Sequence, residues 1–267
     1  MKKPIGIFDS GVGGLTVFKE IRQKFPYEDI VYFGDTARVP YGPKSPATII
    51  QYSLQNARFL LHQQVKMIVV ACNTASSYAL EQLQQVIPVP VIGVIEPGAK
   101  AAIAKTRNNR IGIIGTYGTV NSGAYQNEIH KLRSEAVVYS HPCPMFVPIV
   151  EEGLENHAVA MQLAREYLAK LIIKDIDTLI LGCTHYPIMK DTIQKVTENK
   201  INLIDSAEVI AASLQEILPE IETEGKGKDL FFVSDNEDNF RRIAERIIGS
   251  ELTYLQKVIL GESWFVN

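Results

Sequence analysis

Short apolar runs alternate with helical patterns along most of the chain, and this alternation restricts the fold class. The runs that predict strands cover residues 5–8, 30–33, 67–71, 91–95, 111–114, 137–139, 178–181 and 202–204. The helical patterns between them cover residues 46–63, 76–86, 122–132, 157–173, 188–198 and 207–217. Buried strands that alternate with helices are typical of α/β proteins. The sequence therefore predicts an α/β fold with mostly parallel sheets.

The second half of the chain repeats the order of features in the first half. Five pairs correspond in order, with separations between 106 and 111 residues: Ile5 with Ile111, Val31 with Val138, Val39 with Val147, Cys72 with Cys183, and Ile95 with Ile204. Any α/β chain repeats strand and helix, so partial agreement can also arise without duplication. Five pairs in order favour two similar, pseudo-symmetric domains. We expect residues 1–97 plus 207–267 to form the first, residues 98–206 the second, and the active site to lie in the cleft between them.

Cys72 and Cys183 take equivalent places in the two repeats, each directly after an apolar run and before a polar turn that opens a helix. In open α/β sheets, ligands bind at the carboxyl ends of the strands. A helix N-terminus there stabilises both a thiolate and a substrate carboxylate. Small polar residues follow each thiol: Asn73 and Thr74 after the first, Thr184 and His185 after the second.

Two thiols that meet in one cleft suit racemisation. One base removes the α-proton from one face of the substrate, and an acid delivers a proton to the other face. A free thiol titrates near ~8.5, so one cysteine can be a thiolate while its partner stays protonated. We therefore predict that Cys72 and Cys183 are the catalytic pair.

Other interpretations of the cysteines remain open at this point. A single free cysteine is often only a small buried hydrophobe. A zinc site built from Cys183 and His185 is disfavoured because no Cys-x-x-Cys pair occurs, and we predict no metal. Cys143 has no counterpart in the other repeat, which indicates a packed loop thiol.

Polar turns follow the first two strands of the chain. The turn at residues 9–14 is rich in glycine, but Thr16 breaks the dinucleotide fingerprint and no Gly-Lys pair of a phosphate-binding loop is present. Close backbone approach to a small anion, with Ser10 as a donor, is the better explanation, beside the alternative of a simple tight turn. The second turn, at residues 34–42, offers donors that could cover a ligand.

Asp9 and His185 could tune the two thiols. However, a lone Asp at a strand end is often a helix cap, and a lone His is often structural.

Composition excludes several classes of partner. The formal net charge is −3, and Lys and Arg are scattered, so we expect no nucleic-acid partner. The first apolar segment meets a charge at Asp9, which is too early for a signal peptide or membrane span. We therefore expect no membrane association and a cytoplasmic location. Three cysteines do not make a disulfide framework.

Four segments together resemble the glutamate racemases: residues 8–15, 34–42, 71–76 and 182–187. The likeness continues through residues 94–97 and 146–153, so it covers all but roughly the last fifty residues. The resemblance implies a member of the cofactor-independent aspartate/glutamate racemase family. Such an enzyme interconverts L-glutamate and D-glutamate without pyridoxal phosphate or metal, and it supplies D-glutamate for peptidoglycan.

The resemblance also implies residue roles. Cys72 would remove the proton from D-glutamate and Cys183 from L-glutamate, assisted by Asp9 and His185. The implied substrate contacts are Asp9, Ser10, Tyr41, Gly42, Asn73, Thr74, Thr184 and His185. Thr116 and Thr119 are weaker candidates for holding a substrate carboxylate, and Glu151 for a supporting role. Family members are commonly homodimers, so we expect a homodimer here.

Three other functions compete with this interpretation. A racemase for another acidic amino acid, such as aspartate, would use the same pair of thiols. A solute-binding protein also has two similar lobes, but it has no need of paired thiols. A cysteine hydrolase would use one thiol with a histidine and leave the second unexplained.

Overall fold

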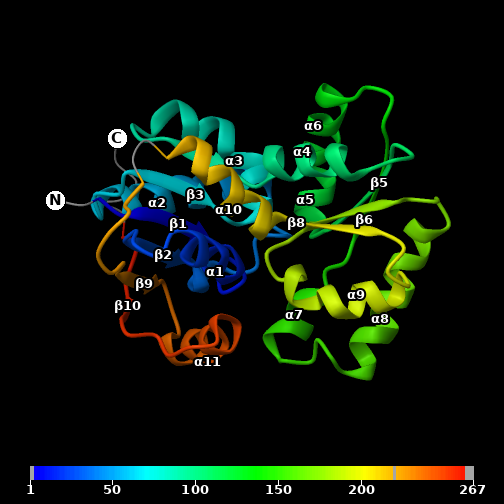
Figure 1. Ribbon diagram of the computed structural model, residues 1–267. Helices are drawn as coiled ribbons and strands as arrows, with labels where there is room; N and C mark the ends of the chain where they lie inside the picture. The colour runs from blue at the N-terminus through cyan, green and yellow to red at the C-terminus, as the bar shows by residue number, and fades with distance from the viewer. Residues whose placement is uncertain (1–2, 219–220, 262–267) are drawn as a thin grey trace.

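The computed structural model describes residues 3–218 and 221–261, and within them the strands form two separate parallel sheets (Figure 1). The larger sheet has the order β10-β9-β2-β1-β3-β4 and the smaller β6-β5-β7-β8. The strands are β1 (Ile5–Asp9), β2 (Ile30–Gly34), β3 (Met67–Val70), β4 (Val91–Gly93), β5 (Arg110–Gly115), β6 (Val137–Pro142), β7 (Thr178–Gly182), β8 (Asn202–Asp205), β9 (Asp229–Val233) and β10 (Leu255–Lys257). All described strand pairs are parallel, which confirms the predicted fold class.

Helices connect the strands. They are α1 (Leu15–Lys24), α2 (Pro46–His62), α3 (Asn73–Val86), α4 (Ile95–Lys105), α5 (Tyr117–Asn121), α6 (Ala124–Leu132), α7 (Phe146–Glu151), α8 (Ala158–Ile172), α9 (Lys190–Val196), α10 (Ser206–Ile217) and α11 (Glu237–Ile248). The six helices predicted between strands all exist, with ends shifted by up to three residues. The predicted strand 91–95 was too long, because β4 stops at Gly93 and Ile95 already begins α4.

The two sheets share one topology, since β2-β1-β3-β4 has the same order as β6-β5-β7-β8. Ile5 lies beside Met67, and Ile111 lies beside Thr178, so pairing Ile5 with Ile111 agrees with pairing Cys72 with Cys183. Two other sequence pairings were out of register. Ile5 lies beside Ile30, and Ile111 lies beside Val138, so Val31 corresponds to Tyr139 rather than to Val138.

The second register error lies at the end of the repeat. Gly93 pairs with Val70, and Asp205 pairs with Leu181, so Gly93 corresponds to Asp205. The sequence comparison had instead matched residues 95–96 with residues 204–205. Short strands carry too few side chains to fix a register by similarity, whereas inter-strand hydrogen bonds define it.

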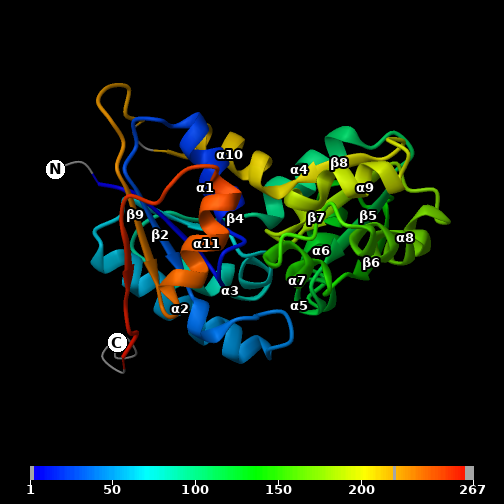
Figure 2. The ribbon, with the colours of Figure 1, turned by 90° about the horizontal axis from the view of Figure 1, so that it is seen from below.

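Three elements near the C-terminus, β9, α11 and β10, were not predicted from the sequence. Strands β9 and β10 add to the four repeated strands and complete the six-stranded sheet. Helix α11 packs beside α1 (Figure 2). Phe240, Ile243, Ala244 and Ile247 form the buried face of α11 at helical spacing. That periodicity is present in the sequence and would have revealed the helix.

The two halves share part of one hydrophobic core. Ile7 of β1 and Val69 of β3 belong to the same buried cluster as Ile113 of β5 and Ile180 of β7. Helices α4 and α10 pack against each other and complete this cluster. The predicted domain divisions fall in the first turns of these two helices, so the chain crosses between the halves as helix rather than loop. None of the helices in the described residues is long and apolar enough to cross a membrane.

Because Ile180 is fully buried in the shared core, Ile180→Ala should lower the free energy of unfolding by about 2–5 kcal/mol, through lost burial and a residual cavity. Urea denaturation would measure this change. The control Ile173→Ala removes a side chain that is 77% exposed and should change little. Equal effects of the two substitutions would contradict the described core.

Candidate active site

A small cavity of about 50 Å³ lies where the carboxyl ends of both sheets meet. Its lining includes nine of the ten residues predicted from the sequence: Ser10, Tyr41, Gly42, Cys72, Asn73, Thr74, Cys183, Thr184 and His185. The tenth, Asp9, is fully buried at the end of β1, directly before Ser10. The lining also contains Val39, Pro40, Thr116, Val147 and Glu151. The structure thus brings the predicted residues together.

Cys72 caps the N-terminus of α3 and is 5% exposed. Its Sγ accepts a hydrogen bond from the backbone N–H of Ala75 at 3.5 Å and lies 3.7 Å from Oγ of Ser10. Burial, together with the negative charge of Asp9, raises the pKa of the Cys72 thiol to about 12. This thiol is therefore protonated at neutral pH in the described geometry.

Cys183 follows β7 and has a different partner. Its Sγ lies 3.8 Å from Nδ1 of His185, whose Nε2 lies 2.9 Å from Oε1 of Glu151. Burial lowers the pKa of His185, but hydrogen bonds and charge from Cys183 and Glu151 outweigh that effect and raise this pKa to about 10. A protonated His185 stabilises a thiolate at Cys183. The two thiols therefore have different neighbours, Ser10 beside Cys72 and His185 beside Cys183.

Asp9 joins the two halves beside the cavity. Its carboxylate accepts a hydrogen bond from the backbone N–H of Gly11 at 2.9 Å and another from Oγ1 of Thr184 at 3.4 Å. Burial raises the pKa of Asp9, while the positive charge of His185 opposes the rise. Asp9 therefore acts on both thiols, by raising the pKa of Cys72 and by interacting with the imidazole beside Cys183.

The glycine-rich turn packs closely against the opposite half at Gly13. A Cβ on Gly13 would lie 2.3 Å from Oγ1 of Thr184 and 2.5 Å from the ring of His185. The close backbone approach expected at this turn is present at Gly13, where the neighbouring groups are side chains of the opposite half. Only glycine permits this contact.

Hydroxyl and amide groups line the wall next to Cys72. The side chain of Thr74 lies 2.8 Å from Thr116 and 3.1 Å from Thr119, and these last two lie 3.2 Å apart. Asn73 donates from Nδ2 to the hydroxyl of Tyr125 at 2.8 Å, while its Oδ1 is buried without a hydrogen-bond partner in the described structure. Such groups can bind a carboxylate and an ammonium group.

Tyr41 and Gly42 line the cavity, and the side-chain hydroxyl of Tyr41 is already bonded elsewhere. The hydroxyl of Tyr41 points away to the carboxylate of Asp35 and accepts a hydrogen bond from Asn56 at 3.0 Å. The carbonyl of Gly42 accepts from the N–H of Gly118 at 2.9 Å, across the two halves. Sequence reasoning did not identify Asp35, although its partners Arg38 and Tyr41 belong to the same loop.

The described residues contain no cluster of three or more His, Cys, Asp or Glu side chains placed to hold a metal ion. Cys183 and His185 instead face each other as a hydrogen-bonded pair. The chemistry available from these side chains is acid–base transfer between buried groups.

Comparison with known proteins places the chain in a family. The family described as Asp/Glu/Hydantoin racemase matches residues 10–214. The glutamate racemase of Geobacter metallireducens is 51% identical over 97% of this chain and 97% of that protein. A glutamate racemase from Bacillus anthracis has a structure with a TM-score of 0.93, at 42% identity over 96% of this chain and 97% of the other. The glutamate racemase of Francisella tularensis, crystallised with D-glutamate, gives a TM-score of 0.92 at 41% identity over 98% and 99%.

Two parallel sheets that bring a pair of buried thiols and a histidine–carboxylate pair into one cavity define an α/β enzyme of acid–base type. The chain belongs to the Asp/Glu/Hydantoin racemase family. It is accordingly an isomerase.

The histidine–carboxylate pair can be tested by titration. The His185 imidazole should stay protonated through neutral pH and lose its proton near pH 10. In Glu151→Gln the pKa of His185 should fall, because the paired carboxylate is gone. NMR of the imidazole would measure both values. Titration at the same pH in both proteins would contradict the described pair.

The same pair should affect stability. Because the folded-state pKa of His185 is raised above its ordinary value of about 6.5, its stabilisation is complete below about pH 6.5 and is lost as the pH rises through about 10. The difference in unfolding free energy between wild type and Glu151→Gln should shrink over that interval.

Proposed function

We propose that the chain is a glutamate racemase that interconverts L-glutamate and D-glutamate by proton transfer between two cysteines. The observation that carries the proposal is the placement of Cys72 and Cys183, one from each half, in the lining of a single buried cavity. The names of its relatives, and the D-glutamate bound in the Francisella tularensis structure, support glutamate as the substrate.

The reaction uses one thiolate and one thiol. From L-glutamate, the Cys183 thiolate takes the α-proton, and the electron pair left on the α-carbon is stabilised by the adjacent carboxylate. The Cys72 thiol then gives its proton to the opposite face of the α-carbon. The products are D-glutamate, a thiol at Cys183 and a thiolate at Cys72. The reverse reaction exchanges the two roles, and no cofactor is required.

Substrate recognition is proposed to use the polar walls of the cavity. The hydroxyls of Thr74, Thr116 and Thr119 lie within 3.2 Å of one another and suit a carboxylate. The unpartnered Oδ1 of Asn73 suits the substrate ammonium group. Ser10, Thr184 and the backbone at Gly42 supply further contacts.

We also propose a cellular setting and a domain division. D-glutamate would be used for peptidoglycan, and the enzyme would act as a homodimer in the cytoplasm, as the resemblance to glutamate racemases implies. Residues 1–97 plus 207–267 would form one domain and residues 98–206 the other. The two sheets support this division, since β5 to β8 all lie within the second range.

Racemisation in deuterated water tests the activity and the two-base step together. Starting from L-glutamate without added cofactor, the D-glutamate formed first should carry solvent deuterium at the α-carbon, because its new proton comes from the second thiol. Mass spectrometry after chiral separation would measure this. Aspartate serves as the parallel substrate, and faster conversion of aspartate would favour that alternative. Product without deuterium would contradict the two-base reaction.

Replacement of either active-site thiol should stop turnover. Cys72→Ala and Cys183→Ala should each lower kcat by about 10³-fold or more, since each removes one partner of the proton transfer. Circular dichroism of glutamate solutions would follow the rate. Cys143→Ala is the matched control, because Cys143 is equally buried but lies outside the cavity lining. Near-normal turnover in either active-site variant would show that its thiol is only structural.

A further inference from the structure

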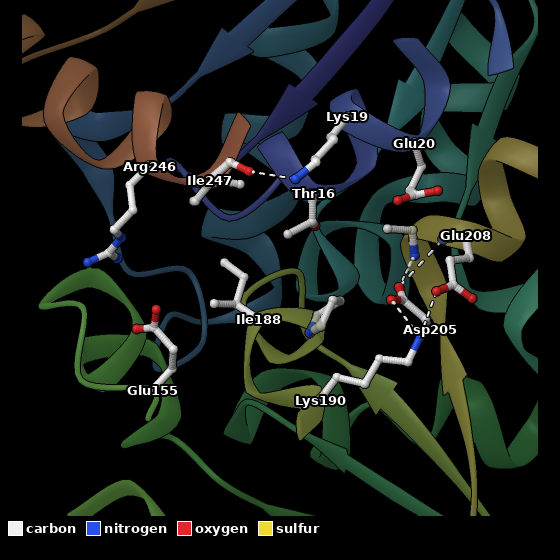
Figure 3. Close-up of a pocket in the computed structure, with 12 residues that line it drawn as sticks. Thr16, Lys19, Glu20, Glu155, Ile188, Lys190, Asp205, Glu208, Arg246 and Ile247 are labelled. Carbon is white, nitrogen blue, oxygen red and sulfur yellow. Dashed lines mark hydrogen bonds and ion pairs between the residues drawn. The ribbon is translucent and has the colours of Figure 1, made fainter. Parts of the chain in front are cut away.

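Arg246 of the C-terminal helix α11 contacts the segment that carries Glu151, although Arg246 itself is not part of the cavity lining. Its Nη2 donates to the backbone carbonyl of Val150, and the carbonyl of Glu151 lies 3.5 Å away. In Figure 3, Arg246 extends from α11 toward the opposite half, on the side where Glu155 lies. The contact therefore crosses between the two halves.

These carbonyl groups lie at the C-terminal end of α7 (Phe146–Glu151). The last carbonyls of a helix have no partner within the helix, and a cation there is favourable. The turn that follows is shaped to admit the guanidinium group. Gly153 has φ +74°, and a Cβ on it would lie 2.1 Å from Nη1 of Arg246. Both features of the turn suit an arginine at this place.

The helix that carries Arg246 is itself firmly held. Four side chains of α11 are buried against the core: Phe240, Ile243, Ala244 and Ile247. Lys19 of α1 donates from Nζ to the carbonyl of Ile247 at 3.1 Å, next to Arg246 in sequence (Figure 3). The guanidinium group therefore reaches the end of α7 from a fixed base, although Arg246 is exposed to solvent.

We propose that Arg246 is a positioning residue for the catalytic base, because it fixes the end of α7 and thereby holds Glu151 on His185 and His185 on Cys183. The contacts run from Arg246 to the backbone of Val150 and Glu151, then from Glu151 to Nε2 of His185 at 2.9 Å, then from Nδ1 of His185 to Cys183 at 3.8 Å. The inference rests on the proposed function of this site.

Other ionisable groups also face this pair, so the effect of Arg246 has to be separated from theirs. Asp9 of β1 interacts with His185. Four further groups interact with Cys183: Cys72 on α3, Tyr125 on α6, Cys143 before α7 and Tyr186 after β7. None of these five groups hydrogen-bonds to Arg246 in the described structure. Substitution of Arg246 therefore leaves their contacts with the pair in place.

The test measures the thiolate directly by alkylation of the full-length protein with iodoacetamide, followed by mass spectrometry of each cysteine. In Arg246→Ala, alkylation of Cys183 at neutral pH should slow by about tenfold, as expected for loss of one charge-assisted hydrogen bond. Its pH profile should shift upward, because a less well-held Glu151 stabilises the imidazolium less. Alkylation of Cys72 should not change. Glutamate turnover should fall by a similar factor.

Two further variants make the result specific. Arg246→Lys keeps a donor and should restore part of the rate, and it also serves if Arg246→Ala folds poorly. Arg242→Ala removes another arginine of α11, which donates from Nη2 to Oδ1 of Asn239 on the same helix at 2.9 Å, and should leave alkylation and turnover unchanged. An unchanged alkylation profile of Cys183 in both Arg246 variants would overturn the inference.

A double-mutant cycle then tests whether Arg246 acts on Cys183 through Glu151. If Arg246 acts through Glu151, adding Arg246→Ala to Glu151→Gln should slow Cys183 alkylation no further. Additive effects would overturn the proposed route. Because alkylation needs no substrate, this result stands apart from the proposed function, which fails if the wild-type protein does not racemise glutamate.

Discussion

The structure depends on the close approach of two turns, one from each half. The turn after β1 brings Gly13 against Thr184 and His185, with no space for a Cβ at Gly13. In the same region, Oγ1 of Thr16 donates to the carbonyl of Thr184 at 2.9 Å, and Oγ1 of Thr184 donates to Asp9. A parallel sheet presents the ends of its strands at one edge, and these contacts set the two edges against each other. The cavity between the thiols is a consequence of that juxtaposition.

The topology of the two halves is the same, but their electrostatics differ. Cys72 and Cys183 follow corresponding strands, as the sheet registers require. Cys72 lies near the carboxyl of Asp9, which favours the protonated thiol. Cys183 lies beside a histidine whose pKa is raised by its hydrogen bonds to Cys183 and Glu151. The shared strand order places the two thiols in corresponding positions, while the side chains around each thiol differ.

Much of this arrangement could be predicted from the sequence, because parallel strands and their polar ends leave local patterns. The α/β class and the strand-end positions of Cys72 and Cys183 follow from apolar runs and the turns after them, whereas the resemblance to glutamate racemases implied the full set of cavity residues. The register of β2 and β4 against their counterparts could not be predicted, since hydrogen bonds to neighbouring strands fix it. The contact of Arg246 with Val150 joins residues 96 positions apart. No local pattern identifies such a contact.

The site also shows why its chemistry depends on both halves at once. Cys72, Cys183 and His185 are all buried, so charges around the cavity are poorly screened and act strongly on one another. His185 receives a carboxylate from its own half through Glu151 and interacts with Asp9 from the other half. Removing either half would expose the imidazole to water and return its pKa toward the ordinary value. The raised pKa of His185 is therefore a property of the assembled interface rather than of the segment that carries the imidazole.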